Sequence, residues 1–192
     1  MKDESNFIAN LKDENSRDKA FEILLDKYKK PIYWHIRKIV LDHDDSHDVL
    51  QNTFVKVFRG IKNFKENSKL YTWIYRIATN ESLNFIKNKA KKHFRTSEEI
   101  MKYQTEKLKE DPYFDGDELQ LELQKIINSL PTKQKLVFQM KYEQEMKFKD
   151  IADILETSEG ALKASYHIAV KKIKKEIIKN QTFKHKYSQI IK

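Results

Sequence analysis

The chain groups aromatic, amide and cationic side chains along one expected helix, and these residue types together suit single-stranded nucleic acid. Aromatic rings stack on unpaired bases, amides hydrogen-bond base edges, and lysine and arginine neutralise phosphates. At 100° per residue one contiguous helix face holds Trp73, Arg76, Asn80, Asn84, Lys87 and Lys91. The basic track continues to Arg95 with Lys89 and Lys92 and without an acid. Trp73 fits a place in the core equally well.

A second basic group follows the turn Glu156-Thr157-Ser158, in which Ser158 is a good N-cap for a helix. One face of that helix is apolar, with Leu162, Tyr166, Ala169, Ile173 and Ile177. The opposite face is small and cationic, as a recognition helix in a major groove requires, with Gly160, Lys163, Ala164, His167, Lys171 and Lys174. A short helix with Ile151, Ala152 and Leu155 precedes the turn, so the segment predicts a helix-turn-helix. A helical hairpin with a solvated lysine face is the alternative.

A third group lies on the helix that we expect from Ser46 to about Gly60, capped by Ser46 or Asp45. Leu50, Phe54, Val57 and Ile61 point one way. The other way point Asp48, Asn52, Val55 and Arg59, with Gln51 at the edge. A face that mixes an acid, amides, an aliphatic residue and arginine is typical of a protein interface. An ordinary amphipathic helix with one exposed valine is the alternative.

His43 and His47, spaced four apart among aspartates, are the best candidates for a metal site. Acids are expected at a helix N-terminus in any case, because they interact favourably with the helix dipole. The sequence has no Cys, no evident nucleophile and no glycine-rich phosphate loop. We therefore predict that the protein is not an enzyme and that it has no metal and no cofactor.

The composition indicates an all-α protein whose positive charge fits either a polyanion partner or a solvated, lysine-rich surface. Of 192 residues only three are Gly and three Pro, 35% are charged, and the formal net charge is +9. So few turn formers favour helices over a β-sandwich or barrel, and the positive charge suits nucleic acid. There is no apolar run of membrane-spanning length, and the first ten residues do not form a secretory signal. We expect a cytoplasmic protein without membrane insertion.

The apolar spacing predicts two small helical domains joined by a flexible acidic linker. The first domain covers 1–95, with helices near 7–11 and 19–28, a helix that starts at Pro31, and two more to 60 and over 70–92. The linker covers 96–118 and is rich in charged and amide residues. The second domain, 119–180, is the helix-turn-helix (winged-helix-like) domain, with helices near 119–130, 133–142, 149–155 and 159–179. A basic tail covers 181–192.

Three segments in register resemble bacterial extracytoplasmic-function (ECF) RNA polymerase sigma factors of the sigma-70 family. Residues 44–64, DDSHDVLQNTFVKVFRGIKNF, resemble the polymerase-binding segment of that family. Residues 71–87, YTWIYRIATNESLNFIK, are similar to its promoter-melting helix, with the core W-I-Y-R-I-A-x-N. Residues 127–173, from INSLPTKQK to HIAVKKI, resemble its C-terminal helix-turn-helix domain. The resemblance spans roughly residues 20–177.

The resemblance implies a factor that binds core polymerase, directs it to specific promoters and melts the −10 element. The implied contacts with the β′ clamp helices are Asp45, Asp48, Gln51, Asn52, Val55 and Arg59. A base flipped from the −10 element would enter the loop 64–70, and the implied −10 contacts are Phe64, Lys65, Asn67, Ser68, Lys69, Tyr71, Trp73, Arg76, Asn80, Lys87 and Lys91. The implied −35 contacts are Ser158, Glu159, Gly160, Lys163, Ala164, His167, Lys171 and Lys174. The β flap and an anti-sigma factor are further implied partners, and the linker would thread through the polymerase cleft.

The recognition helix departs from the family pattern. Ser165 and Ile168 stand where arginines are usual, and Ala161 stands where threonine is common. Arginine is the usual bidentate reader of guanine, so the −35 base preference of the family does not transfer to this chain. A regulator that binds duplex operators without polymerase is the main alternative, but it leaves the face from Trp73 to Lys91 unexplained. A helical adaptor without DNA binding conflicts with the basic tracks.

Overall fold

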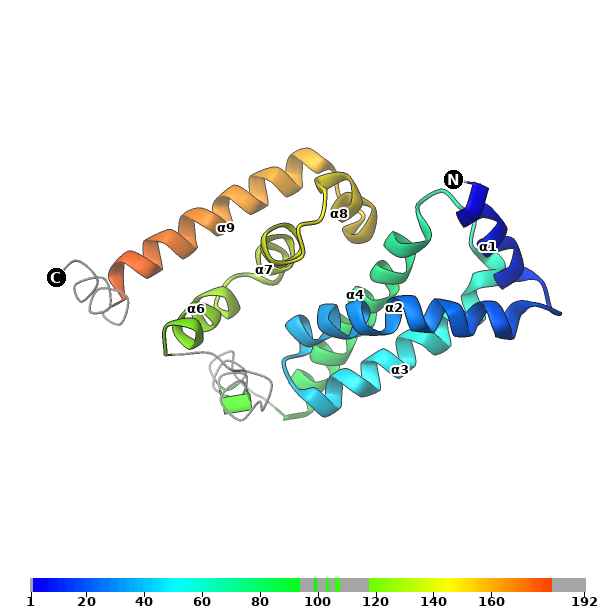
Figure 1. Ribbon diagram of the computed structural model, residues 1–192. Coiled ribbons are helices and arrows are strands. Elements are labelled where there is room, and N and C mark those ends of the chain that lie inside the picture. The colour runs from blue at the N-terminus through cyan, green and yellow to red at the C-terminus, as the bar shows by residue number, and fades with distance from the viewer. Residues whose placement is uncertain (1, 94–98, 100–102, 104–105, 108–117, 181–192) are drawn as a thin grey trace. The chain divides into compact units, whose positions relative to one another are not determined.

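The computed structural model describes residues 2–93, 99, 103, 106–107 and 118–180, and all regular structure within them is helical (Figure 1). Most of the expected linker, 96–118, and all of the expected tail, 181–192, lie outside the described residues. The chain divides into two compact units, Met1–Lys92 and His93–Lys192. None of the helices described is long and apolar enough to cross a membrane.

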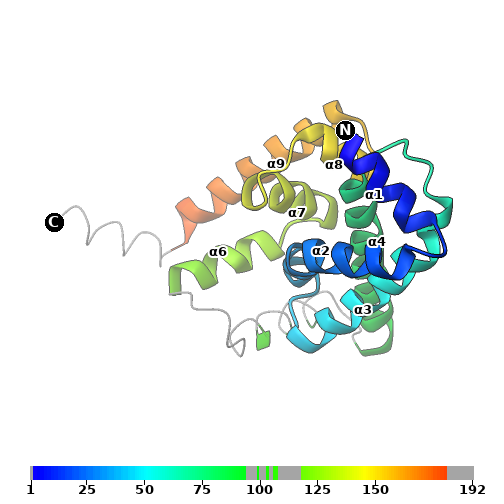
Figure 2. The same cartoon turned by 45° about the vertical axis from the view of Figure 1, so that its right-hand side comes forward.

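Unit 1 is a helical bundle that buries one apolar core. It contains α1 (Lys2–Lys12), α2 (Arg17–Val40), α3 (His43–Gly60), the short η1 (Ile61–Asn63) and α4 (Leu70–His93). Helices α2 and α3 run antiparallel side by side, as Figures 1 and 2 both show. All five elements and the loop before α4 contribute to the core, which includes Leu11, Leu24, Ile36, Val57, Ile61, Phe64, Leu70 and Ile74.

Helix α2 continues through Pro31, where the prediction began a new helix. Proline lacks an N–H and costs about 3 kcal/mol in a helix interior. Leu24 and Ile32, on either side of it, are fully buried, and the loss of exposed apolar surface along the whole helix offsets that cost. Pro31 itself is exposed.

Helix α3 begins at His43, three residues before the predicted start, and Asp42 caps it. The Asp42 carboxylate accepts a hydrogen bond from the backbone N–H of Asp45 at 3.0 Å. The predicted cap Ser46 is instead buried within the first turn, where its hydroxyl donates to the Asp42 carbonyl. The extended backbone of Asp42 lets its side chain reach an orphan N–H, which is the requirement for an N-cap.

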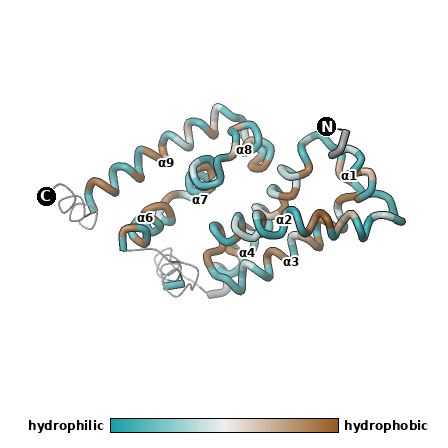
Figure 3. The backbone as a smooth tube through the Cα atoms, viewed as in Figure 1, coloured by the Kyte–Doolittle hydropathy of each residue, from teal (hydrophilic) through white to brown (hydrophobic). Residues whose placement is uncertain are grey.

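Unit 2 consists of α6 (Glu118–Asn128), α7 (Thr132–Phe138), the π-helical turn η2 (Gln139–Glu143), α8 (Phe148–Leu155) and α9 (Glu159–Lys179). In Figure 3 hydrophobic and hydrophilic residues alternate along α9, the pattern of an amphipathic helix. Its buried stripe meets α6 and α7 in a core of Ile126, Ile127, Leu130, Phe138, Ala169 and Ile173. The helix predicted over 133–142 changes to i+5 bonding at its end, where Gln144 N donates to the Gln139 carbonyl at 3.1 Å.

Helices α8 and α9 form the predicted helix-turn-helix. The turn is produced by Glu156, whose backbone is left-handed at φ 50° and ψ 47°. Ser158 caps α9, because its hydroxyl oxygen accepts from the N–H of Ala161 at 3.4 Å. On α8 the buried residues include Ile151 and Ile154, whereas Leu155 is half-buried.

Candidate functional site

Helix α3 has the two faces that its sequence predicts. Leu50, Phe54 and Val57 are buried in the core of unit 1. The other face is exposed and carries Asp48, Gln51, Asn52, Val55 and Arg59, with Val55 41% exposed. Covering an exposed aliphatic side chain with a partner protein is favourable, because it removes apolar surface from water.

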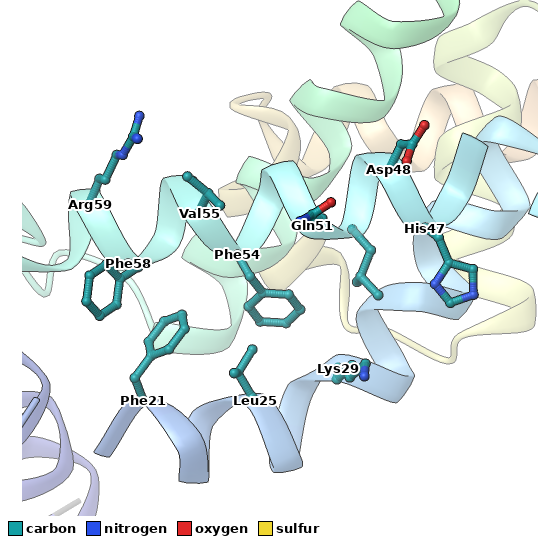
Figure 4. Close-up of a pocket in the computed structure, with 11 residues that line it drawn as sticks. Phe21, Leu25, Lys29, His47, Asp48, Gln51, Phe54, Val55, Phe58 and Arg59 are labelled. Atoms are coloured by element: carbon teal, nitrogen blue, oxygen red, sulfur yellow. The ribbon is translucent and has the colours of Figure 1, made fainter. Parts of the chain in front are cut away.

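A groove of about 750 Å³ runs along this face between α2 and α3. Figure 4 shows Phe54 and Phe58 pointing toward Phe21 and Leu25 of α2, while Arg59 points away from α2. The rings of Phe21 and Phe58 meet edge to face at 4.9 Å. Four of the predicted polymerase contacts line the groove, namely Asp48, Gln51, Val55 and Arg59. Sequence analysis missed the α2 side, although the i, i+4 pair of Phe21 and Leu25 marked an apolar face there.

Asp45 does not lie on this open face. Its carboxylate forms an ion pair with the Lys89 amine of α4, and the two side chains are 20% and 26% exposed. It therefore ties the start of α3 to α4. Its assignment as a polymerase contact stays a prediction, for a carboxylate that is already paired with Lys89.

The loop between η1 and α4 is anchored by Phe64, which is only 6% exposed. Its ring lies 5.0 Å from that of Trp73, which packs against the same core. A Cβ on Gly60 would lie 3.3 Å from the Trp73 ring, so this glycine permits the close approach of the indole. Phe64 therefore packs in the core of unit 1, and its assignment as a DNA contact stays a prediction. Trp73 is half-buried and packs against the loop through Phe64, and its assignment as a DNA contact stays a prediction.

The rest of the loop and one face of α4 are open to solvent. Lys65, Asn67 and Lys69 are exposed and Ser68 is half-buried. Tyr71 is half-buried, with the Lys69 amine 5.5 Å from its ring centroid. Along α4 the predicted face follows, with Arg76 half-buried and Asn80, Asn84, Lys87 and Lys91 exposed. Amide donors and cations are the groups that hydrogen-bond base edges and neutralise phosphates in single-strand binding.

A buried polar network fixes α4 beneath this face. The His35 ring of α2 hydrogen-bonds Thr79 at 2.8 Å, and the Thr79 hydroxyl also donates to the Tyr75 carbonyl at 2.7 Å. The His35 and Tyr75 rings lie 4.9 Å apart, and burial raises the pKa of Tyr75. Because buried polar groups must be paired, this network sets the rotation of α4 and thereby keeps the next residue, Asn80, outward.

In unit 2 the outer face of α9 is open along its length. Ser158 and Glu159 are exposed at its start, and the predicted groove face follows with Gly160, Lys163, Ala164, His167, Lys171 and Lys174, all exposed. Lys163 lies 3.9 Å from Glu159 in an exposed i, i+4 pair. Nothing lies within 4 Å of where a Cβ on Gly160 would be, so the start of the helix is unobstructed. Small residues before lysines allow close backbone approach to DNA followed by phosphate contacts.

The histidines considered as metal ligands contact each other and Tyr33. Among the described residues there is no group of three potential His, Cys, Asp or Glu ligands. Nδ1 of His43 hydrogen-bonds the Tyr33 hydroxyl at 2.8 Å, and the His43 and His47 rings are 4.7 Å apart edge to face. They form an aromatic cluster at the start of α3.

Comparison with known proteins assigns both units. Residues 24–92 match the family model of sigma-70 region 2, and residues 120–173 match that of sigma-70 region 4. Together the two models cover more than half of the chain. The chain belongs to the sigma-70 family of RNA polymerase sigma factors. Because these factors initiate transcription and are not enzymes, the metal-enzyme alternative is wrong. The sigma-factor function is supported over the alternative of a regulator that binds operators without polymerase.

Curated relatives assign this sigma factor to the ECF group. It is 27% identical to the ECF RNA polymerase sigma-E factor of Haemophilus influenzae over 83% of its own length and 88% of that protein. It is also 27% identical to the ECF RNA polymerase sigma factor SigW of Bacillus subtilis, over 82% and 89% of the two chains. The predicted family is confirmed.

Solved structures share the fold at lower identity. A structure of CnrH in complex with the cytosolic domain of CnrY matches with a TM-score of 0.67 and 17% identity, over 92% of this sigma factor and 98% of that chain. The sigma factor RpoE from Bartonella quintana, in complex with the anti-sigma factor NepR, matches with a TM-score of 0.63 and 17% identity, over 82% and 96%. The all-α fold with a helix-turn-helix domain is confirmed.

Proposed function

We propose that unit 1 of this ECF sigma factor binds core polymerase through α3 and captures the −10 element through the loop 64–69 and α4, while α9 of unit 2 contacts the −35 element. The observation that carries this proposal is the division of unit 1 into two exposed faces of different chemistry. The face on α3 mixes charge of both signs with an aliphatic residue. The face on α4 has amides and cations without acid.

The partner on the α3 face is the clamp-helix coiled coil of the β′ subunit. Asp48 and Arg59 lie toward opposite ends of the face with Val55 between them, so a helical partner can meet a negative end, an apolar centre and a positive end. Such a pattern sets the direction in which the partner lies as well as the affinity. The apolar floor of the groove, with Phe54 and Phe58, receives its aliphatic side chains.

Promoter melting uses the other face. Extruding one base costs a few kcal/mol, which stacking and hydrogen bonds in a pocket must offset. The loop offers the exposed Asn67 and Lys69 for the base, and α4 adds the exposed Asn80. Lys87 and Lys91 neutralise the phosphates of the strand that the base leaves.

In the closed complex, where the promoter is still double-stranded, α9 binds the DNA. Gly160 and Ala164 let the start of the helix approach the groove, and His167 is placed to meet base edges. Lys171 and Lys174, further along the helix, neutralise phosphates.

We also infer how the protein is regulated and where it is located in the cell. Both matched structures are complexes, and the one from Bartonella quintana holds an anti-sigma factor. An anti-sigma factor that covers the polymerase-binding face would silence this protein by competition. Core polymerase and chromosomal DNA lie in the bacterial cytoplasm, and we place the protein there.

Transcription in vitro with purified bacterial core polymerase on a promoter library tests the proposal. We expect promoter-specific RNA with the protein and none without it, together with permanganate-reactive thymines near −10. The free chain should bind closed duplex weakly, because the α4 face requires a single strand. Tight, sequence-specific binding of the free chain to closed duplex, without polymerase-dependent transcription, would contradict the proposal.

A further inference from the structure

Helix α1 and the turn that follows it are joined to the loop 64–69 and to both flanks of that loop by side-chain contacts. Figures 1 and 2 show α1 beside the segment that links α3 to α4. The region 2 family model begins only at residue 24, so α1 lies outside the part of the chain that it matches. We infer that α1 is a positioning element that holds the loop in the conformation needed to capture the −10 base. This inference rests on the function proposed for the loop.

The first contact is an ion pair at the middle of the loop. The Lys12 amine at the end of α1 lies 2.6 Å from a carboxylate oxygen of Glu66. The same amine lies 5.9 Å from the centroid of the Phe64 ring. One α1 side chain therefore contacts both the buried anchor of the loop and its exposed turn.

Glu66, which forms the ion pair with Lys12, has an unfavourable backbone conformation. Glu66 has φ 58°, in the left-handed region that residues with a Cβ avoid. Such conformations persist where the surroundings hold them, and they occur often at functional sites. Because the chain passes through this left-handed residue, the conformation of Glu66 affects the relative directions of its neighbours Lys65 and Asn67.

A second contact fixes the end of the loop. The Glu4 carboxylate accepts a hydrogen bond from the backbone N–H of Leu70 at 3.3 Å. Leu70 is the first residue of α4, where backbone N–H groups have no partner within the helix. A carboxylate at this place also interacts favourably with the helix dipole. Glu4 therefore caps α4 from another helix and fixes where the loop stops.

A third contact fixes the approach to the loop. The Lys62 amine of η1 lies 2.7 Å from the carboxylate of Glu14, in the turn that follows α1. Beneath these polar contacts Ile8 and Leu11 belong to the same core as Phe64 and Leu70. The loop is thus held before its start, at its middle and at its end by one N-terminal segment.

A positioning role must be separated from simple support of the fold, which Ile8 and Leu11 already provide. Lys12→Met removes the charge and keeps the aliphatic stem over Phe64. Lys56→Met is the matched control, because Lys56 lies 2.6 Å from Glu81 in an ion pair that joins α3 to α4 away from the loop. Glu4→Gln keeps an acceptor for the Leu70 N–H, whereas Glu4→Ala removes it.

The measurement is binding of holoenzyme to a single-stranded −10 oligonucleotide that carries each of the four bases in turn at the captured position. We expect Lys12→Met and Glu4→Ala to reduce discrimination between the preferred base and the others by roughly two- to fivefold, the effect of one exposed ion pair or hydrogen bond. Lys56→Met and Glu4→Gln should keep the native discrimination, and all four variants should bind core polymerase normally.

Asn67→Ala, a change within the loop itself, distinguishes failure of this inference from failure of the proposed function. If Asn67→Ala leaves base discrimination unchanged, the loop does not capture the base, and the proposed function is wrong there. If Asn67→Ala reduces discrimination while Lys12→Met behaves like Lys56→Met, the loop captures the base without help from α1, and the inference is overturned.

Discussion

Replacing Lys171 with alanine separates general attraction to DNA from reading of the −35 sequence. Lys171 is exposed on the outer face of α9. About 20 Å of helix, at 1.5 Å per residue, separates it from the N-cap Ser158. The N-terminal residues of a recognition helix reach base edges, so under the proposed function we expect a side chain this far along the helix to meet phosphates at the flank of the groove.

The size of the effect follows from the release of counterions. One phosphate contact contributes about 0.9 to the slope of log affinity against log salt concentration. Lys171→Ala should lower the slope by that amount, which at 0.1 M salt corresponds to a loss of affinity of roughly eightfold. The loss should be the same on promoters with different −35 sequences, because phosphates carry no sequence information.

Lys172→Ala is the matched control for this experiment. Its side chain is also exposed, but its amine donates to the Gln134 side-chain oxygen of α7 at 3.1 Å. It therefore faces the body of unit 2, and its removal should leave the slope unchanged. Closed complexes of holoenzyme with two fluorescent duplex promoters, titrated from low to moderate salt in the cold, provide the measurement. Equal slopes for Lys171→Ala and the native chain, or equal losses for the two lysine variants, would refute the assignment of this face.

Three further changes test other parts of the molecule. Asp48→Ala combined with Arg59→Ala should weaken core binding at least tenfold in a fluorescence titration with unaltered thermal unfolding, since both residues are exposed; unchanged affinity would mean that α3 is not the docking helix. Asn80→Ala should slow −10 melting, measured by permanganate reactivity, while closed complexes persist; normal melting would remove it from the site. Burial lowers the pKa of Lys135 below its usual value of 10.5. Between the lowered value and 10.5 the unfolded chain therefore binds more protons than the folded chain. The free energy of unfolding rises with pH across this window. Lys135→Met should therefore stabilise the chain against urea at pH 7 and less so near pH 10, whereas an equal gain at both would exclude burial of the charge as the cause.

The periodicity of apolar residues predicted most of the fold. On α9 the expected inner residues Leu162, Ala169 and Ile173 are buried, and Ser158 caps the helix as expected. These features are local, because a helix repeats every 3.6 residues and a cap acts within one turn. The faces of α3 and α4 were predictable for the same reason. The direction of a side chain on a helix follows from its position in the sequence.

The sequence could not predict contacts between distant segments. Asp45 has the charge and the position of a polymerase contact, but Lys89 neutralises it across 44 residues of sequence. Phe64 has the chemistry to stack on a base, but the core of unit 1 encloses its ring. The groove beside α3 needs Phe21 and Leu25 of another helix. A pattern along one helix contains no information about which neighbour covers it.

The family motif W-I-Y-R-I-A-x-N on α4 contains residues that pack in the core and residues that are exposed and available for contact. Trp73 packs against Phe64 and approaches Gly60 closely, and therefore holds the loop from within. Asn80, two turns later on the same helix, is exposed because the buried His35–Thr79 hydrogen bond fixes the rotation of α4. Under the proposed function we expect a change at either residue to impair promoter melting, whereas only a change at Trp73 also removes packing from the core. Comparing the loss of melting with the loss of unfolding free energy therefore separates the residues that shape the −10 site from those that touch DNA.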